Sequence, residues 1–160
     1  MPNPTPSGPS ESNNHSQPRR HWISILAKST SGQIEALWSE LSIHPTWTHI
    51  RPPETGMVMV RGRSGGDGKR FNLGEMTMTR AAVRLVDGPT GFGYVQGRSK
   101  RHAELVAVID AMLQLPQHRS NIEDNIVQPL AREQEERRDL RSRKAAGTKV
   151  EFFTMTRGDG

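Results

Sequence analysis

The chain has 160 residues, of which 32% are hydrophobic, and a net charge of +5; this suits one domain with a modest core and acidic partners. It contains no cysteine, which excludes disulfides, thiolate nucleophiles and thiolate-held zinc or iron–sulfur clusters in this chain. With no apolar run long enough to cross a bilayer and no signal-peptide pattern, we expect a soluble, cytoplasmic protein without membrane contact.

The N-terminal region divides into a polar tail and a helical part. Residues 1–18 are rich in Pro, Ser and Asn and lack hydrophobic periodicity, so we expect a disordered tail followed by a single domain over 19–158. From Arg19 onward, apolar residues recur at helical spacing in two groups separated by a Ser-Gly break. These groups are Trp22, Ile23, Ile25 and Leu26, then Ile34, Leu37, Trp38 and Leu41. They predict an N-terminal helix pair.

The middle of the chain predicts a small antiparallel sheet. Residues 42–55 hold three prolines and two histidines, which favours an extended connector before a first strand at Met57–Val60. A second strand is expected over 75–86, where alternation separates an arginine-bearing face from a face that is apolar toward its end. Turn residues at 87–91 then lead into a third strand at 92–96.

The C-terminal half is predicted to be mainly helical. Residues 99–115 show an apolar pattern over more than half of a helix circumference, which indicates a core helix. A second helical region over 120–146 contains Pro129, whose ring predicts a kink. The apolar residues Val150, Phe152 and Phe153 suggest a short final strand. The predicted fold class is therefore α+β: a helix pair, a small antiparallel sheet, a core helix, a kinked helical segment and a final strand.

Arginines and glycines dominate the candidate contact residues. A glycine-rich turn at 64–68 lies between Arg61 and Arg63 on one side and Lys69 and Arg70 on the other, and it could cradle an anion. Its spacing matches neither a P-loop nor a dinucleotide fingerprint, so a turn with solvated charges is the favoured interpretation. Arg80 and Arg84 share one strand face, where they could clamp a triphosphate or contact a partner protein. The partner contact is favoured, because an open strand face suits docking better than a closed pocket.

Histidine patterns predict neither catalysis nor metal binding. His102 and Glu104 stand two residues apart on a helix and would point in different directions, so a capping or interface role is expected for His102. His44 and His49 lack a third ligand at credible spacing. We therefore assign no catalytic, cofactor-binding or metal-ligating residue. The candidates for partner or anion contact are Arg61, Arg63, Arg80, Arg84, His102, Phe152 and Phe153.

The chain contains three distinctive strings, RGRSGGDGKRFNLGEMTMTRAAVRL, GFGYVQGRSKRHAEL and VEFFTMTRG. Together they resemble the PhnG family, the small subunit of the bacterial carbon–phosphorus lyase core complex, and the resemblance runs from about Arg19 to Gly158. The family pattern often has Cys after the Thr-Arg pair, whereas Ala81 stands here. An essential thiol at this position is therefore excluded for this chain.

The resemblance implies an accessory role in phosphonate catabolism. A larger subunit would transfer methylphosphonate to the ribose of ATP with release of adenine, forming alpha-D-ribose 1-methylphosphonate 5-triphosphate. The partners would be the other core subunits, and ATP would be a substrate of the complex. The iron–sulfur cluster and S-adenosylmethionine would belong to another subunit, in agreement with the lack of cysteine here.

Two alternatives remain open at the level of sequence. The chain could itself form the ribose phosphonate, holding the triphosphate with Arg80 or the glycine-rich turn. It could instead be a basic nucleic-acid-binding module, which its pI of about 10.2 favours. The strands, however, lack aromatic residues interleaved with basic ones, and no recognition helix is evident, so nucleic-acid binding is the weaker interpretation.

Overall fold

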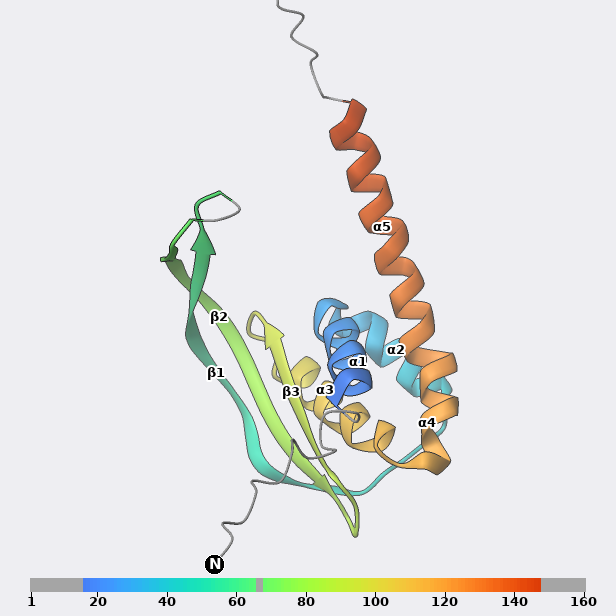
Figure 1. The fold of residues 1–160 in the computed structure, drawn as a ribbon. Coiled ribbons are helices and arrows are strands. Elements are labelled where there is room, and N and C mark those ends of the chain that lie inside the picture. The colour runs from blue at the N-terminus through green and yellow to red at the C-terminus, as the bar shows by residue number, and fades with distance from the viewer. Residues whose placement is uncertain (1–15, 66–67, 148–160) are drawn as a thin grey trace, which may run out of the picture.

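The computed structural model describes residues 16–65 and 68–147, which form five α-helices and one π-helical turn around one three-stranded sheet (Figure 1). The element bounds are α1 (Ser16–Lys28), α2 (Ser31–Glu40), β1 (Trp47–Arg63), β2 (Arg70–Leu85), β3 (Thr90–Gln96), α3 (Lys100–Leu113), α4 (Pro116–Ile122), the π-helical turn η2 (Glu123–Val127) and α5 (Gln128–Gly147). The sheet is antiparallel in the order β1-β2-β3. The α+β prediction is confirmed. No helix in the described ranges is long and apolar enough to span a membrane.

Helix α3 lies against one face of the sheet and forms the centre of the core. Every residue from Leu105 to Leu113 is buried, and α1, α2 and α4 surround the helix. Two glycines of β3 allow this close packing: a Cβ added at Gly91 would stand 1.9 Å from the Ala107 carbonyl oxygen, and one at Gly93 would stand 2.0 Å from the Ala103 carbonyl oxygen. The predicted core helix is confirmed, and its backbone lies directly on β3.

A buried carboxylate connects helices α1 and α3 and strand β3. Asp110 of α3 is fully buried and accepts hydrogen bonds from Arg19 Nε at 3.0 Å, Trp22 Nε1 at 2.9 Å and the Phe92 backbone N–H at 2.9 Å. A second guanidinium nitrogen of Arg19 lies 2.6 Å from the other carboxylate oxygen. Because every donor is directed at one side chain, Asp110 sets the position of α1 and β3 relative to α3.

The N-terminal helix pair is confirmed with shifted ends. Helix α1 begins at Ser16, so Ser16–Pro18, expected in the tail, belong to the helix; residues 1–15 lie outside the described ranges. Pro18 fits because a first-turn N–H has no partner within a helix. The break between the helices falls before Ser31, since Thr30 caps α2 in a reciprocal arrangement with Gln33.

The first strand is much longer than the predicted Met57–Val60. It begins at Trp47 and includes Pro52 and Pro53, in the region expected to be a connector. The pairing register shifts on either side of Arg51. Because β1 is an edge strand, prolines at such an irregularity need not donate to a neighbouring strand. Likewise, β2 begins at Arg70 rather than near residue 75, so the two strands form a hairpin that extends beyond the body (Figure 1).

At the position of the kink predicted for Pro129, the helical segment changes its helix type. Helix α4 continues into η2, and the Gln128 N–H that closes this wide turn donates to the Glu123 carbonyl oxygen. Pro129 follows as the second residue of α5 and does not interrupt the helix. A π turn accommodates the proline because the widened turn relieves the contact between the ring and the preceding carbonyl. The predicted final strand with Val150, Phe152 and Phe153 lies outside the described residues.

Candidate functional site

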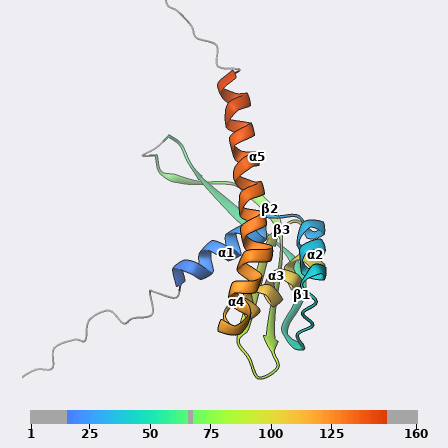
Figure 2. The ribbon, with the colours of Figure 1, turned by 90° about the vertical axis from the view of Figure 1, so that its right-hand side faces the viewer.

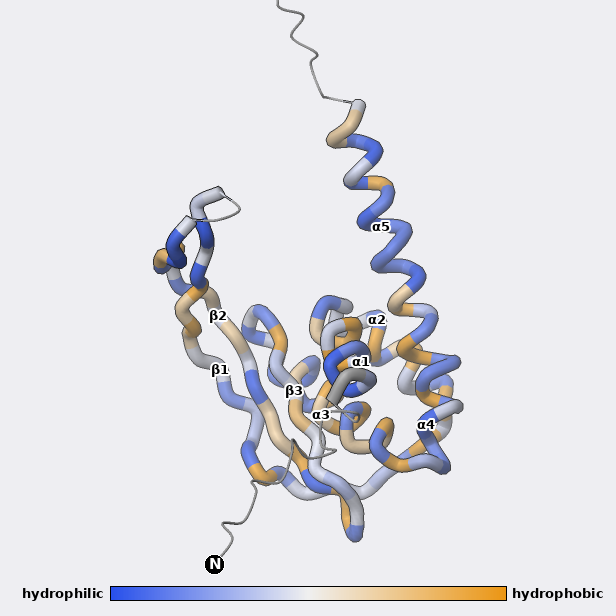
Figure 3. The backbone as a smooth tube through the Cα atoms, viewed as in Figure 1, coloured by the Kyte–Doolittle hydropathy of each residue, from blue (hydrophilic) through white to orange (hydrophobic). Residues whose placement is uncertain are grey.

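The hairpin of β1 and β2 and the helix α5 both extend past the body at the same end (Figures 1 and 2). Apart from partly buried Val60 and Gly62, the described residues of the hairpin from Thr55 to Glu75 that lie in β1 and β2 are exposed. Helix α5 is exposed from Arg138 to Gly147. Figure 3 shows that the distal part of α5 is largely hydrophilic, whereas hydrophobic residues mark the hairpin below its hydrophilic tip. Two extended surfaces are therefore available to other molecules.

Arg61 and Arg63 lie near the tip of the hairpin, together with Lys69 and Arg70. Both predicted arginines are exposed, and within the described residues neither side chain has an ion-pair partner. Arg63 faces Arg70 across the strand pair, so like charges are concentrated at one end of the hairpin. Their role as contacts for a partner or an anion remains a prediction.

Arg80 is held within the chain by a carboxylate of β1. Its Nε donates to Glu54 Oε1 at 2.7 Å, and Arg51 Nη1 donates to the same oxygen at 2.7 Å. Arg84 makes a long hydrogen bond of 3.4 Å from Nε to Thr90 Oγ1. A carboxylate between Arg51 and Arg80 opposes the binding of a triphosphate there, which favours the protein-contact interpretation of this face.

The arginine contacts of Glu54 have a measurable consequence. Hydrogen bonds from Arg80 and then Arg51 lower the pKa of Glu54 below its ordinary value of 4.5. Because the folded-state pKa of Glu54 is depressed, its contacts with Arg80 and Arg51 stabilise the fold fully at pH values above the unfolded-state pKa. This stabilisation is lost as the pH falls through the folded-state pKa. We expect carboxyl NMR titration to show a midpoint below 4.5 that rises in Arg80→Ala. The same midpoint in both proteins would show that Arg80 does not bind Glu54 in solution.

His102 serves the interior of the chain. Its side chain is buried, and Nε2 donates to the Leu26 carbonyl oxygen at 3.0 Å, which joins α3 to α1. The neighbouring Glu104 points elsewhere, toward His49 Nε2 at 2.8 Å. The expectation that His102 and Glu104 diverge is confirmed. His102 is nearly fully buried but also lines the groove described below, so its role as a partner contact remains a prediction. The cap of α3 is instead Ser99, whose hydroxyl accepts from the His102 backbone N–H.

The strand register brings one basic residue beside an aromatic ring. Arg80 pairs with Tyr94 and Ala82 pairs with Phe92 in the register of β2 and β3, and both rings are exposed. Only the register reveals the Arg80–Tyr94 pair, because its two members lie on different strands. The Arg19 guanidinium lies 5.5 Å from the centre of the Phe92 ring, so this ring already has a cation over it.

A groove of about 1010 Å³ lies between the open face of the sheet and α5. Met76, Met78 and Tyr94 line it on the sheet side, and α1 and the following residues form its floor. The opposite wall is α5, where lining residues recur at helical spacing: Ala131, Gln134, Glu135, Arg138 and Arg141, with Arg137 beside them. The groove was missed because it combines three elements that are distant in sequence.

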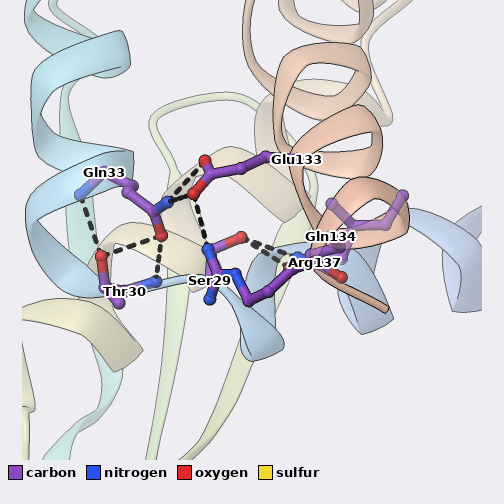
Figure 4. A network of polar contacts seen from close by, with 7 residues as sticks. Ser29, Thr30, Gln33, Glu133, Gln134 and Arg137 are labelled. Carbon is purple, nitrogen blue, oxygen red and sulfur yellow. Dashed lines mark hydrogen bonds and ion pairs between the residues drawn. The ribbon is translucent and has the colours of Figure 1, made fainter. Parts of the chain in front are cut away.

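A polar network fixes the base of α5 beside this groove (Figure 4). Gln134 Nε2 donates to the Ile25 carbonyl oxygen at 2.8 Å and to Ser29 Oγ at 3.0 Å. Glu133 accepts from Gln33 Nε2 at 2.5 Å and from Arg137 Nη2 at 2.6 Å. Because these bonds reach both α1 and α2, the first two turns of α5 are held in place and direct the rest of the helix along the groove.

Comparison with known proteins identifies relatives over nearly the same range. The family model described as "Phosphonate metabolism protein PhnG" matches residues 17–158. A curated relative from Rhizobium meliloti (strain 1021), the subunit PhnG of alpha-D-ribose 1-methylphosphonate 5-triphosphate synthase, is 43% identical over 142 residues, which cover 88% of this chain and 90% of the relative. The matched range includes the sheet, α3 and all of α5. The chain therefore belongs to the PhnG family of phosphonate metabolism proteins.

Proposed function

We propose that this chain is an accessory subunit of an alpha-D-ribose 1-methylphosphonate 5-triphosphate synthase. The observation that carries the proposal is the 43% identity to the Rhizobium meliloti synthase subunit over 88% of the chain. At this identity and coverage the fold and the partners are expected to be shared. The reaction would transfer methylphosphonate to the ribose of ATP and release adenine.

The described surface supports a role through contact with other subunits. The hairpin and α5 expose apolar and basic residues well beyond the body, including Met57, Met59, Phe71 and Leu73. Exposed apolar side chains on a projecting strand pair are typical of a surface that becomes covered in an assembly. In this proposal ATP is a substrate of the complex, and iron–sulfur and S-adenosylmethionine chemistry belongs to another subunit. Because ATP would be its substrate, we propose a cytoplasmic location for the complex.

Co-expression with the other synthase subunits tests the proposal. We expect the full chain to co-elute with them in size-exclusion chromatography, and adenine release from ATP and methylphosphonate to require the chain. The isolated chain serves as a control for intrinsic activity, since release by a well-folded sample alone would instead support an independent enzyme. A solitary monodisperse chain with no effect on adenine release would contradict the subunit assignment.

Arg80 can be tested in the same experiment with a charge-swapped control. Arg80→Glu removes the bond to Glu54 and also changes the surface, so assembly of this variant alone is ambiguous. The double variant Glu54→Arg with Arg80→Glu restores an intrachain pair while reversing the charge that a partner meets. If Arg80 contacts a partner, both variants co-elute poorly; if its role is only to bind Glu54, the double variant assembles normally.

A further inference from the structure

The sheet face opposite α3 carries apolar side chains on both sides of one arginine. On β2 and β3 the residues facing away from α3 include Met78, Ala82, Phe92 and Tyr94, with Arg80 between Met78 and Ala82 and paired with Tyr94. Met76 lies on the same face of β2 and is paired with Val58 of β1. Met76, Met78 and Tyr94 line the groove. No helix of the described residues covers these side chains in the way that α3 covers the other face.

Apolar side chains also lie on the projecting hairpin. Phe71 and Leu73 both lie beside Gly62, since a Cβ added there would stand 3.4 Å from Leu73 Cδ1 and 3.4 Å from Phe71 Cζ. The register shifts between Val60 and Arg61, but the extra residue there is Leu73 of β2. Alternation along β1 therefore puts Gly62 on the same side as Val58. Val58, Phe71 and Leu73 are 40%, 44% and 66% exposed. Apolar side chains thus extend from the hairpin into the groove, so an extended segment could contact them along its length.

The opposite wall of the groove is basic. Among the described lining residues, Lys28, Arg137, Arg138 and Arg141 are cations, whereas Glu135 is the one carboxylate. Arg137 is partly neutralised by Glu133 at 2.6 Å, but Arg138 and Arg141 have no ion-pair partner within the described residues. A ligand in the groove would therefore meet apolar side chains on one side and positive charge on the other.

The distal part of helix α5 has few contacts within the described chain that would stabilise it. Beyond Arg137 its described residues are all exposed, so this distal part of α5 gains little from packing on its own chain. A segment bound between α5 and the sheet would contact the side of the helix that carries Arg138 and Arg141 and would stabilise it.

We propose that this groove binds an acidic, amphipathic segment of another subunit of the synthase. Its apolar side chains contact those from Phe71 to Tyr94, and its carboxylates face Arg138 and Arg141. The inference rests on the proposed function and adds which surface binds the partner and which chemistry the partner supplies. A second copy of this chain is a poorer match, because its net charge of +5 would bring like charges together.

Charge reversal on α5 tests the groove with a matched control. Arg138→Glu with Arg141→Glu reverses the groove wall, whereas Arg132→Glu with Arg143→Glu makes the same charge change on the same helix away from the groove lining. We expect the first pair to lower the amount of partner subunit retained by the tagged full chain by about tenfold or more, and the second pair to lower it little. Retention by the wild type should also fall with added salt more steeply than retention by the first pair.

The apolar wall is tested by Met76→Ser with Tyr94→Ser. This variant should retain less partner at every salt concentration, since the lost contact is apolar rather than ionic. Thermal unfolding of each variant shows whether its fold is intact, and only variants with a wild-type transition are compared. Wild-type retention in all groove variants overturns the groove assignment while leaving the subunit assignment in place. Failure of the wild type itself to retain partners overturns both.

A photo-crosslinking residue at position 94 or 141 identifies the occupant. The expected result is a crosslink from both positions to one acidic segment of another synthase subunit in the assembled complex. Crosslinks to a second copy of this chain, to residues 148–160 of the chain itself, or to nucleic acid would overturn the proposed occupant.

Discussion

Asp110→Ala is expected to lower the free energy of unfolding of the full chain by about 3–5 kcal/mol. The carboxylate is fully buried and accepts from Arg19, Trp22 and the backbone of Phe92. Arg19 is 31% exposed and can turn toward water, so the broken ion pair contributes only part of the loss. The Trp22 and Phe92 donors cannot do so easily, and each unsatisfied buried donor costs about 1–3 kcal/mol.

Urea unfolding followed by tryptophan fluorescence measures this effect directly, since Trp22 is one of the partners. Asp139→Ala is the matched control, because Asp139 is exposed on α5 and surface changes of this kind usually stay within about 0.5 kcal/mol. Asp110→Asn should be intermediate, since the amide keeps one oxygen acceptor. A loss in Asp110→Ala no larger than in the control would show that the hydrogen-bond cluster does not hold α1 and β3 to α3.

Gly91→Ala should destabilise the chain by at least about 2 kcal/mol, although it adds only one methyl group. The new Cβ would stand 1.9 Å from the Ala107 carbonyl oxygen and 2.6 Å from the Ala111 backbone nitrogen. These are backbone atoms of α3, so no flexible side chain can move aside. The helix must shift away from β3, and the packing of the buried face of α3 is weakened along its length.

Gly32→Ala adds the same methyl group, but it is expected to raise the free energy of unfolding. Gly32 lies in α2, and a Cβ added there meets nothing within 4 Å. Alanine should therefore stabilise the chain by about 0.5–1 kcal/mol, because glycine is unfavourable inside a helix. Chemical denaturation of both variants gives the comparison. Equal stabilities would mean that β3 and α3 are not in backbone contact in solution.

Gly91→Ala and Gly32→Ala also test the proposed partner groove. The open sheet face that would bind a partner is carried by β2 and β3, and the position of β3 depends on Asp110 and on the glycine contacts with α3. A shift of β3 would displace Tyr94 relative to α5. We therefore expect Gly91→Ala to weaken partner retention even at temperatures where the chain stays folded, whereas Gly32→Ala should not.

Local pattern in the sequence determined the helices, the core helix and the α+β class. Trp22, Ile25 and Leu26 recur at helical spacing because one helix face must be buried, and Val83 and Leu85 alternate with Arg84 because one sheet face must be buried. Strand ends were less predictable. Exposed residues of β1 carry no burial pattern, and Pro52 and Pro53 suggested a connector although an edge strand tolerates them.

The tertiary structure alone decided what those elements bring together. Strand register placed Arg80 beside Tyr94 and Glu54, folding of α1 onto α3 buried His102, and α5 brought Arg138 and Arg141 opposite Met76 and Met78. Such contacts join residues far apart in the chain, and neither helical nor strand periodicity contains information about them. The sequence thus determined which side of each element must be buried, whereas packing between elements decided which exposed side chains share the groove.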